Sequence, residues 1–397
     1  MEPPCPSDPP PNSALIAAIR AAIDAAGGKL TFALFMELAL YHPRYGYYQR
    51  ATRGPGRAGD FVTAPEIHPF FGFTLARQVT SCWERLGRPA GFTVREYGAG
   101  TGGLAYDILA GLSVETPALF ATIRYELVES NRHRREEAIA AMRVAGQGLA
   151  GKVRAVAPPA PGEPLRPILG MVLANEVADA LPVHRLVWGK DGPRERYVVW
   201  SEEQGGFADA TGELSAEIAT LDVPGYLASQ GLHLSEGDAI EVSPAAARWF
   251  SDVVAGLERG YALIIDYGYA AADLYQAHRL AGTLRGHYAH TATDNPYVRV
   301  GAQDLTAHVD FTALRQAGEM AGLSSVGLTT QADYLAALGL GDFLVDLQSD
   351  PTTTPPDYFA AQTAVMRLVD PGGMGRFRVL LLARAAPVTG LSGWGEG

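Results

Sequence analysis

The chain has 397 residues, 47% of them hydrophobic, and a formal net charge of −11. This length exceeds that of a usual single domain, so we expect a soluble core domain with a large insertion or a second lobe. The negative charge argues against nucleic acid as a partner, the apolar runs are too short to span a membrane, and two cysteines without a motif indicate no disulfide framework.

The chain begins with a proline-rich stretch. Residues 1–12 lack both the basic region of a secretory signal and the arginine-rich pattern of a transit peptide, so we expect a disordered lead and a cytoplasmic protein. Residues 13–90 are expected to form an N-terminal helical cap and a segment that closes over the cofactor of a nucleotide-binding core. Their predicted elements are helices from Ser13 to Gly27, Thr31 to Leu40 and Pro69 to Leu86, an aromatic segment at 41–48 and a glycine-bearing loop at 54–60.

Strands and helices then alternate. The predicted elements lie at 92–97, 103–112, 123–129, 132–144, 153–156 and 168–174. Such alternation predicts right-handed crossovers and a mostly parallel sheet. Residues 91–182 therefore begin a Rossmann-like α/β core.

The alternation breaks at residues 183–237, which we interpret as an inserted, partly antiparallel lobe. Two β-rich runs flank the turn Asp191-Gly192 there, which predicts a hairpin. Residues 238–397 return to the core and add C-terminal elements. The apolar strand 261–266 should lie centrally, with Asp266 at the carboxyl edge of the sheet, where ligands bind. The remaining predictions are helices at 244–257, 311–321, 331–338 and 356–369 and a closing strand at 377–383.

A glycine-rich loop after the first core strand is the most informative segment. Gly98, Gly100 and Gly103 fit G-x-G-x-x-G, the dinucleotide fingerprint. Glu96, with Gly98, Gly100 and Gly102, fits E-x-G-x-G-x-G, the pattern of class I methyltransferases that bind S-adenosylmethionine. A carboxylate just before the glycines repels a diphosphate but can hold the ammonium of a methionine tail. The acid therefore favours the second pattern.

The next core strand ends in another acid, Glu129. A carboxylate at this place suits a ribose diol, which both cofactors carry, so it supports nucleoside binding without choosing between them. A tight turn that binds nothing is the structural alternative. The ordered succession of strand, glycines, helix and second acid argues against it.

Motifs spread over most of the chain point to one family. They lie at 41–48, 59–66, 96–104, 174–184, 266–268, 282–285 and 304–311. Together they resemble the MidA-like methyltransferases, which are related to a mitochondrial complex I assembly factor that symmetrically dimethylates an arginine. The resemblance implies a class I methyltransferase fold.

The resemblance also implies a cofactor site. It assigns S-adenosylmethionine binding to Thr63, Glu66, Glu96, Gly98, Gly100, Gly102, Glu129 and Asn175. The sequence departs from the family at Val177 and Ala178, where aromatic residues are common. A proline-rich loop after Val156 replaces the polar stretch expected near the adenine, so no adenine contact is assigned.

An arginine acceptor would need carboxylates that fix its guanidinium plane and draw positive charge away from the attacking nitrogen. Glu176 and Asp179 are three residues apart, so a helical turn would place both on one face. Asp266 could reach the same edge from the next core strand. We therefore hypothesise that Glu176, with Asp179 or Asp266, clamps the acceptor and that Asn175 orients it.

Structural alternatives remain open for each of these acids. Asp179 could simply end a helix, and Asp266 could cap a helix or stabilise a turn. Glu66 could be an ordinary first-turn helix acid. Tyr45, with its neighbours Tyr47 and Tyr48, fits packing in the cap better than a cage for a cation.

Histidines cluster loosely late in the chain, at His278, His287, His290 and His308. Their spacing is irregular and no cysteine joins them, so we predict no metal site. His308 lies in a family motif. A hydrogen-bonded structural role suits it better than that of a base.

The sequence thus predicts a methyltransferase that uses S-adenosylmethionine and acts on an accessible arginine of a protein substrate, such as a subunit of respiratory complex I. The alternative is an assembly chaperone on the same fold that does not catalyse. A dinucleotide-dependent oxidoreductase is a minor third possibility. No pattern in the sequence indicates an oligomeric state.

Overall fold

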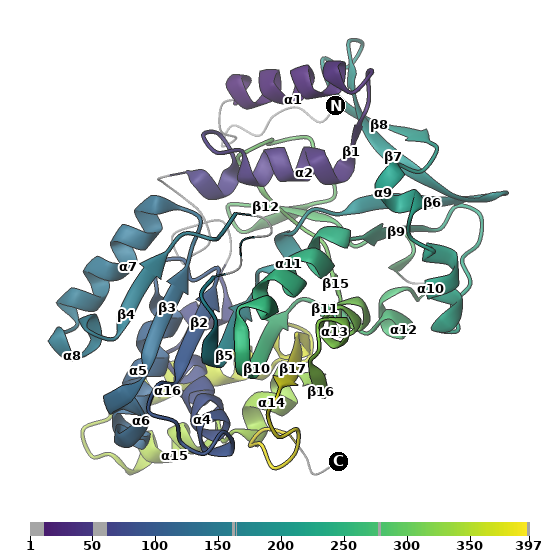
Figure 1. The fold of residues 1–397 in the computed structure, drawn as a ribbon. Helices are drawn as coiled ribbons and strands as arrows, with labels where there is room; N and C mark the ends of the chain where they lie inside the picture. The colour runs from purple at the N-terminus through teal and green to yellow at the C-terminus, as the bar shows by residue number, and fades with distance from the viewer. Residues whose placement is uncertain (1–11, 51–61, 161–162, 164, 277–278, 395–397) are drawn as a thin grey trace. The chain divides into compact units, whose positions relative to one another are not determined.

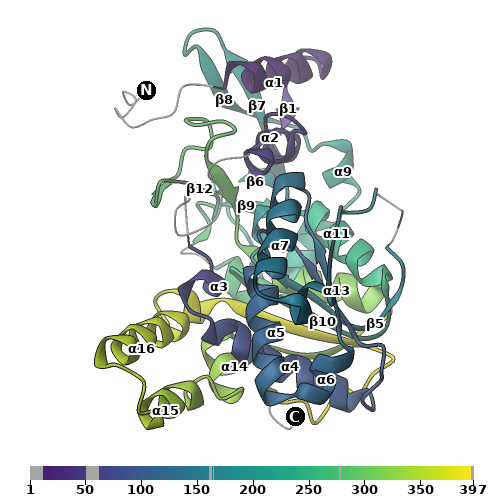
Figure 2. The ribbon, with the colours of Figure 1, turned by 90° about the vertical axis from the view of Figure 1, so that its left-hand side faces the viewer.

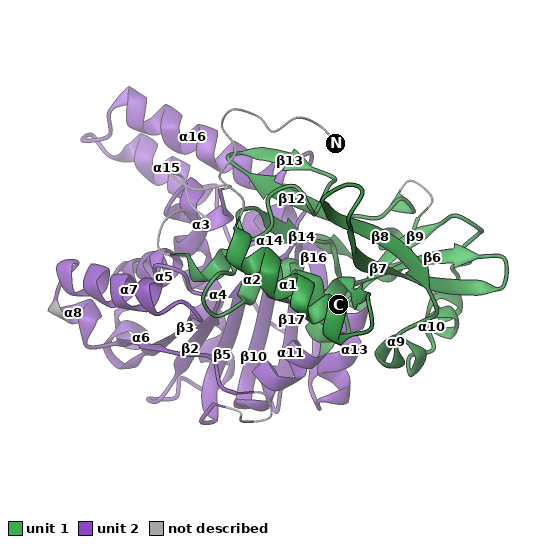
Figure 3. Ribbon diagram, turned by 90° about the horizontal axis from the view of Figure 1, so that it is seen from above, with its two compact units in different colours: residues 1–61, 178–247, 268–312 green, residues 62–177, 248–267, 313–397 purple. Residues whose placement is uncertain are grey.

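The computed structural model describes residues 12–50, 62–160, 163, 165–276 and 279–394. The predicted lead before residue 12, the glycine-bearing loop at 54–60, and the single residues Cys5 and His278 lie outside this part of the chain. The chain divides into two compact units, coloured separately in Figure 3. Unit 1 comprises Met1–Phe61, Ala178–Ala247 and Gly268–Thr312, and unit 2 comprises Val62–Val177, Arg248–Tyr267 and Ala313–Gly397.

Unit 2 contains the predicted Rossmann-like sheet (Figure 1). Its strand order is β16-β17-β10-β5-β2-β3-β4. The strands β4, β3, β2, β5 and β10 are parallel to one another, whereas β17 is antiparallel to both β10 and β16. The bounds are β2 (Thr93–Tyr97), β3 (Arg124–Val128), β4 (Val153–Val156), β5 (Ile168–Asn175), β10 (Leu257–Asp266), β16 (Ser324–Thr330) and β17 (Arg378–Arg384).

Helices cover both faces of this sheet. In Figures 1 and 2, α11 lies on one face and α4, α5 and α16 lie on the other. The helices of unit 2 are α3 (Ala64–Ile67), α4 (Phe70–Arg85), α5 (Gly103–Glu115), α6 (Pro117–Thr122), α7 (Arg132–Val144), α8 (Gln147–Ala150), α14 (Gln331–Ala337), α15 (Asp342–Ser349) and α16 (Pro355–Val369). Two further helices, α11 (Pro244–Ala255) and α13 (Phe311–Met320), begin in unit 1 and end in unit 2.

The strand register brings four loops to one edge of the sheet. Tyr97 pairs with both Val128 and Ala174, and Asn175 pairs with Ile265. Since these strands are parallel, the segments that follow β2, β3, β5 and β10 all leave at the same edge. The core beneath them is apolar, with side chains such as those of Met171 and Ile265 fully buried. This edge is where ligands bind in open α/β sheets.

Unit 1 is built on a separate, antiparallel sheet of order β1-β7-β6-β9, with β8 also paired to β7. The predicted hairpin at Asp191-Gly192 joins β6 to β7, because Gly189 pairs with Gly192. Its strands are β1 (Leu30–Thr31), β6 (His184–Gly189), β7 (Gly192–Ser201), β8 (Gly206–Gly212) and β9 (Ala239–Val242).

Smaller elements complete unit 1. Its helices are α1 (Ser13–Ala25), α2 (Phe32–Tyr41), α9 (Ala216–Ala219), α10 (Val223–Ser229) and α12 (Ala271–Leu274), with 3₁₀ turns at Tyr47–Gln49 and Ala178–Ala180. Short strands pair as β11-β15 and as β13-β12-β14. They are β11 (Gly268–Tyr269), β12 (Arg285–Tyr288), β13 (Thr291–Thr293), β14 (Asp304–Thr306) and β15 (Val309–Asp310).

The predicted α/β fold with an antiparallel lobe is confirmed, but the units do not follow the predicted domain boundaries. The expected cap at 13–90 is divided at residue 61, because β1 pairs with β7 of the lobe while α4 packs on α5 of the core. Residues 268–312, expected in the core, belong to unit 1, where β14 contacts α2 and the 3₁₀ turn at Ala178–Ala180. Among the described residues, no helix is both long and apolar enough to cross a membrane.

Candidate functional site

The glycine loop after β2 has a left-handed backbone at alternate positions. The φ angles are +69° at Gly98, +54° at Gly100 and +81° at Gly102, a region that residues with a Cβ rarely adopt. Gly103, in contrast, is the first residue of α5. The three glycines that require this conformation are therefore those of the E-x-G-x-G-x-G pattern.

The three positions differ in what surrounds them. A Cβ on Gly98 would lie 2.5 Å from Cγ2 of Val177, and one on Gly102 would lie 3.1 Å from Cβ of Ala138. A Cβ on Gly100 would meet nothing within 4 Å. Gly98 and Gly102 thus allow close packing of the chain on itself, whereas Gly100 presents its backbone to open space, as a bound ligand would require.

Glu96 lies at the base of this loop and is 4% exposed. The hydroxyl of Tyr125, from the neighbouring strand β3, donates a hydrogen bond of 2.7 Å to its Oε2. Burial, with a smaller contribution from the nearby Glu129, raises the pKa of Glu96 to about 8, although the Tyr125 hydrogen bond opposes this rise. The approach of a cation would therefore lower the pKa of this carboxyl.

Glu129 braces the loop from the end of β3. Its Oε2 accepts a hydrogen bond of 3.0 Å from the backbone N–H of Gly100, and its Oε1 accepts one of 2.7 Å from the N–H of Asn131. The Ser130 hydroxyl also donates to Oε1, at 3.3 Å. The acid predicted to meet a ribose thus also fixes the backbone of the glycine that faces open space.

The end of β5 carries Asn175 and Glu176. Glu176 has φ +52°, which is unusual for a residue with a Cβ. Its Oε1 accepts hydrogen bonds from the N–H of Ala64, at 2.9 Å, and from Nδ2 of Asn175, at 3.1 Å. Burial raises the pKa of Glu176 to about 8, the two hydrogen bonds oppose that rise, and the negative charge of Asp266 adds to it.

The two polar atoms of the Asn175 side chain differ in their hydrogen bonding. While its Nδ2 donates to Glu176, its Oδ1 is buried and has no hydrogen-bond partner among the residues that the structure describes. A buried acceptor without a donor costs roughly 1–3 kcal/mol. Such an atom is a candidate contact for a bound ligand.

The Thr63–Glu66 segment forms the start of α3. Thr63 and Glu66 make a capping box, in which Oε2 of Glu66 accepts from the N–H of Thr63 at 3.0 Å and from its hydroxyl at 3.2 Å. The structural alternative for Glu66 is therefore realised. The hydrogen bond from Ala64 to Glu176 ties this segment to the end of β5.

Asp266 and Asp179 lie in different environments. Asp266, at the end of β10, is 0% exposed; its Oδ2 accepts from the N–H of Val177 at 3.0 Å and its Oδ1 from the N–H of Tyr267 at 2.7 Å. Asp266 thus fixes the backbone after two strands, as its turn alternative predicts. Asp179 lies in the 3₁₀ turn Ala178–Ala180 of unit 1.

The predicted helical turn that would place Glu176 and Asp179 on one face is wrong. The left-handed backbone at Glu176 interrupts any helix, and the turn that contains Asp179 begins only at Ala178. The sequence also missed Tyr125 and Ala64, the donors to Glu96 and Glu176. Neither could be found from local patterns, because each comes from a distant segment of the chain.

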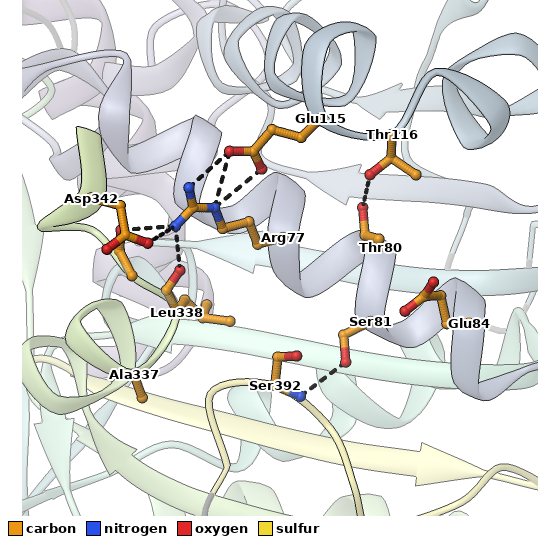
Figure 4. A pocket seen from close by; sticks show the side chains of 11 residues that line it. Arg77, Thr80, Ser81, Glu84, Glu115, Thr116, Ala337, Leu338, Asp342 and Ser392 are labelled. Atoms are coloured by element: carbon orange, nitrogen blue, oxygen red, sulfur yellow. Dashed lines mark hydrogen bonds and ion pairs between the residues drawn. The ribbon is translucent and has the colours of Figure 1, made fainter. Parts of the chain in front are cut away.

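Elsewhere in unit 2, a polar cavity of about 400 Å³ lies between α4, the C-terminal end of α5 and α14–α15 (Figure 4). Its central side chain, Arg77, pairs with Glu115 at 2.8 Å and Asp342 at 2.9 Å, and the Thr80 and Thr116 hydroxyls bond each other at 2.9 Å. Since these groups satisfy one another, we assign no ligand to this cavity.

The histidines do not assemble a metal centre in the described part of the chain, where no group of three or more His, Cys, Asp or Glu side chains could hold an ion. His287 lies on β12, and burial lowers its pKa. The ring of His308 lies 5.6 Å from that of Tyr269.

Comparisons with known proteins agree with this geometry. A family model of S-adenosyl-L-methionine-dependent methyltransferases matches residues 74–329. The mouse mitochondrial protein arginine methyltransferase NDUFAF7 is 29% identical over 346 residues, which is 82% of this chain and 75% of the relative. Its human counterpart is 28% identical over 346 residues, with 82% and 74% covered.

Solved structures are similar over almost the entire chain. A Burkholderia thailandensis protein crystallised with S-adenosyl-homocysteine is 35% identical, with a TM-score of 0.86 and coverage of 99% of this chain and 97% of that one. A native crystal structure from the same organism is 34% identical, with a TM-score of 0.84 and coverage of 100% and 98%.

Proposed function

The chain belongs to the family of S-adenosyl-L-methionine-dependent methyltransferases that this model describes, and from that premise we propose that it methylates an arginine of a protein substrate. The family and the cofactor predicted from the motifs are thereby confirmed. The arginine acceptor is our proposal. It is supported by the names of the mouse and human relatives and by the carboxyl and amide groups at the end of β5.

The described residues fit the cofactor. We assign its amino-acid end to Glu96 and the loop Gly98–Gly102, where the Gly100 backbone faces open space, and its ribose to Glu129. When bound, S-adenosylmethionine supplies an activated methyl group, so the protein mainly contributes alignment and control of charge. Thr63 and Glu66 would support the site as a capped segment held by Glu176.

Glu176 is our candidate for the acid that meets the acceptor. Its Oε1 is already engaged by Ala64 and Asn175, while its Oε2 accepts no hydrogen bond from the described residues. Once the carboxyl is ionised, that oxygen can therefore accept from a guanidinium N–H and draw positive charge toward itself. Asp266 would act indirectly, because its oxygens hold backbone N–H groups of Val177 and Tyr267. Asp179 belongs to unit 1, and its predicted role as a second carboxylate for the acceptor stays a proposal.

Label transfer tests this proposal. Purified protein is incubated with methyl-labelled S-adenosylmethionine and protein or peptide substrates that expose arginine. We expect labelled methylarginine, and we expect Gly100→Ala to abolish it by filling the open space beside the loop. Gly87→Ala is the matched control, because Gly87 has φ +86° and open surroundings but lies after α4, outside the loop.

Two outcomes would contradict the proposal. Label on a side chain other than arginine would show that the acceptor is wrong while the enzyme class stands. Tight binding of a partner protein without any label would favour the chaperone alternative.

A cytoplasmic location is likewise our proposal, and because the relatives are named mitochondrial, cell fractionation is the direct check.

A further inference from the structure

The orientation of the Asn175 side-chain amide is fixed by its neighbour. Oε1 of Glu176 accepts the N–H of Ala64, as the carbonyl oxygen of a carboxyl group does, so we assign any proton of this carboxyl to Oε2 and treat Oε1 as an acceptor. Asn175 can approach such an oxygen only with its Nδ2, as it does at 3.1 Å. A flipped amide would bring two acceptors together.

This arrangement leaves Oδ1 as the remaining polar atom of the side chain. It is buried and has no partner among the described residues. Asn175 ends β5, the strand that pairs with β2 just before the glycine loop. The unpaired acceptor therefore lies at the ligand-binding edge of the sheet, beside the loop assigned to the cofactor.

We propose that Oδ1 of Asn175 is a specificity-determining acceptor that requires an N–H donor from the bound ligand. The inference rests on the proposed function and narrows its chemistry. A nitrogen that carries hydrogen, as in a guanidinium or an ammonium, satisfies the buried atom, whereas a carboxylate or another bare acceptor leaves it unpaired and adds repulsion. The site thus selects ligands that bring an N–H group to this atom, and where the donor is the nitrogen that receives the methyl group, it rejects carboxylates as methyl acceptors.

Two donors carry this chemistry, namely the ammonium at the amino-acid end of the cofactor and the nitrogen that receives the methyl group. Asn175→Leu separates them, because it removes the acceptor at similar size. We measure its affinity for S-adenosylhomocysteine and for methylthioadenosine, which lacks the amino-acid end, and its KM and kcat with an arginine peptide.

The expected result depends on the donor. If the donor is the ammonium, the variant binds S-adenosylhomocysteine about ten-fold or more weakly but binds methylthioadenosine normally. If the donor is the acceptor nitrogen, both nucleosides bind normally and kcat/KM for the peptide falls about ten-fold or more. Either result supports the inference.

Gln331→Leu is the matched control. Gln331 is also a buried amide of unit 2 whose nitrogen donates to a backbone carbonyl, that of Leu368 at 2.9 Å, and whose Oε1 has no partner in the described part of the chain. It begins α14, outside the loops at the ligand-binding edge. We expect it to change neither nucleoside binding nor turnover. Asn175→Ala provides a second test if the leucine variant does not unfold cooperatively.

The inference is overturned if Asn175→Leu binds both nucleosides and methylates the peptide as the wild type does, in which case the proposed function still stands. If the wild-type protein labels no arginine substrate, the proposed function fails, and the paired nucleoside affinities alone decide the inference. Equal losses for both nucleosides would also overturn it, because they would show a general distortion of the site.

Discussion

Two glutamates, one in each unit, are both buried, but they differ in their hydrogen bonds and in the direction in which their pKa is shifted. Glu195 on β7 of unit 1 is 0% exposed; its Oε1 lies 2.7 Å from Nδ1 of His184, and its Oε2 accepts from the N–H of Ser215 at 2.6 Å. Burial by itself would raise the pKa of Glu195, but these hydrogen bonds outweigh it and the pKa is lowered. Both carboxylate oxygens of Glu195 thus have hydrogen-bond partners within the chain itself.

Glu96 in unit 2 is nearly as buried, yet only the Tyr125 hydroxyl donates to it among the described residues, and its pKa is raised to about 8. The comparison suggests a working rule. A buried acid whose two oxygens both receive donors from the chain supports the fold without a ligand, as Glu195 does, and Glu129 shows that such an acid can also border the cofactor site. A buried acid that receives few donors from the chain is a candidate to accept a hydrogen bond from a bound ligand.

The largest expected effect tests the structural side of this comparison. Glu195→Ala leaves His184 and the N–H of Ser215 without their acceptor and should lower the free energy of unfolding by about 3–5 kcal/mol. Urea denaturation measures this change, with Glu202→Ala, in an exposed pair with Arg20, as the control at about 0–1 kcal/mol. Weaker binding of S-adenosylhomocysteine by folded Glu195→Ala would contradict the distinction between an acid that supports the fold and an acid that binds the ligand.

A second variant tests the crowding in the glycine loop. Gly98→Ala forces a Cβ into a left-handed backbone and against Val177, so we expect a loss of about 2–4 kcal/mol in the free energy of unfolding. Adding Val177→Ala should restore the part caused by the clash but not the part caused by φ. The double-mutant cycle is measured by urea denaturation. Additive losses would contradict the contact.

A third prediction concerns pH. Because Glu96 has a higher pKa in the folded protein, about 8, than in the unfolded chain, about 4.5, the folded state binds more protons between these values. Stability should therefore fall as pH rises from about 4.5 to 8 and change little beyond. Glu176 contributes in the same direction, since burial also raises its pKa to about 8.

Glu96→Gln removes one of these two contributions. At pH 8.5 it should raise the free energy of unfolding by roughly 1–3 kcal/mol, and it should weaken S-adenosylhomocysteine binding about ten-fold because the ammonium loses its counter-charge. Urea denaturation at pH 5, 7 and 8.5 and calorimetry measure the two effects. A stability curve with the wild-type slope would show that Glu96 is not the titrating group.

The smallest effect is expected at the polar cavity of Figure 4. Arg77→Met breaks ion pairs with partly exposed partners, so we expect a loss of about 1 kcal/mol and unchanged nucleoside binding. Thermal denaturation and calorimetry check both. A change in nucleoside affinity would show that the cavity communicates with the ligand-binding edge, contrary to our assignment.

The sequence predicted the core where local patterns carry the information. The alternation of strands and helices located β2, β3 and β5, and the glycine spacing located the left-handed turns, because only glycine adopts them readily. The strand β16 was missed, and the units were divided differently, because strand pairings such as β1 with β7 join distant segments and leave no local signal.

For the site, the acids could be predicted but not their donors. Glu96 and Glu129 lie where strand ends predict ligand contacts, yet the bond from Tyr125 depends on the register between β2 and β3. The left-handed backbone of Glu176 could not be predicted, because glutamate seldom adopts it. Its role as an anchor for Ala64 therefore appears only in three dimensions.

The place of β17 has a consequence for synthesis of the protein on the ribosome. This strand, Arg378–Arg384, inserts between β10 and β16, although every other strand of its sheet precedes it in the chain. A nascent polypeptide that stops short of it leaves the apolar β10 with an open edge, which invites pairing with other chains. Folding of unit 2 must therefore finish after translation of this strand, and truncated products should be targets for chaperones and proteases.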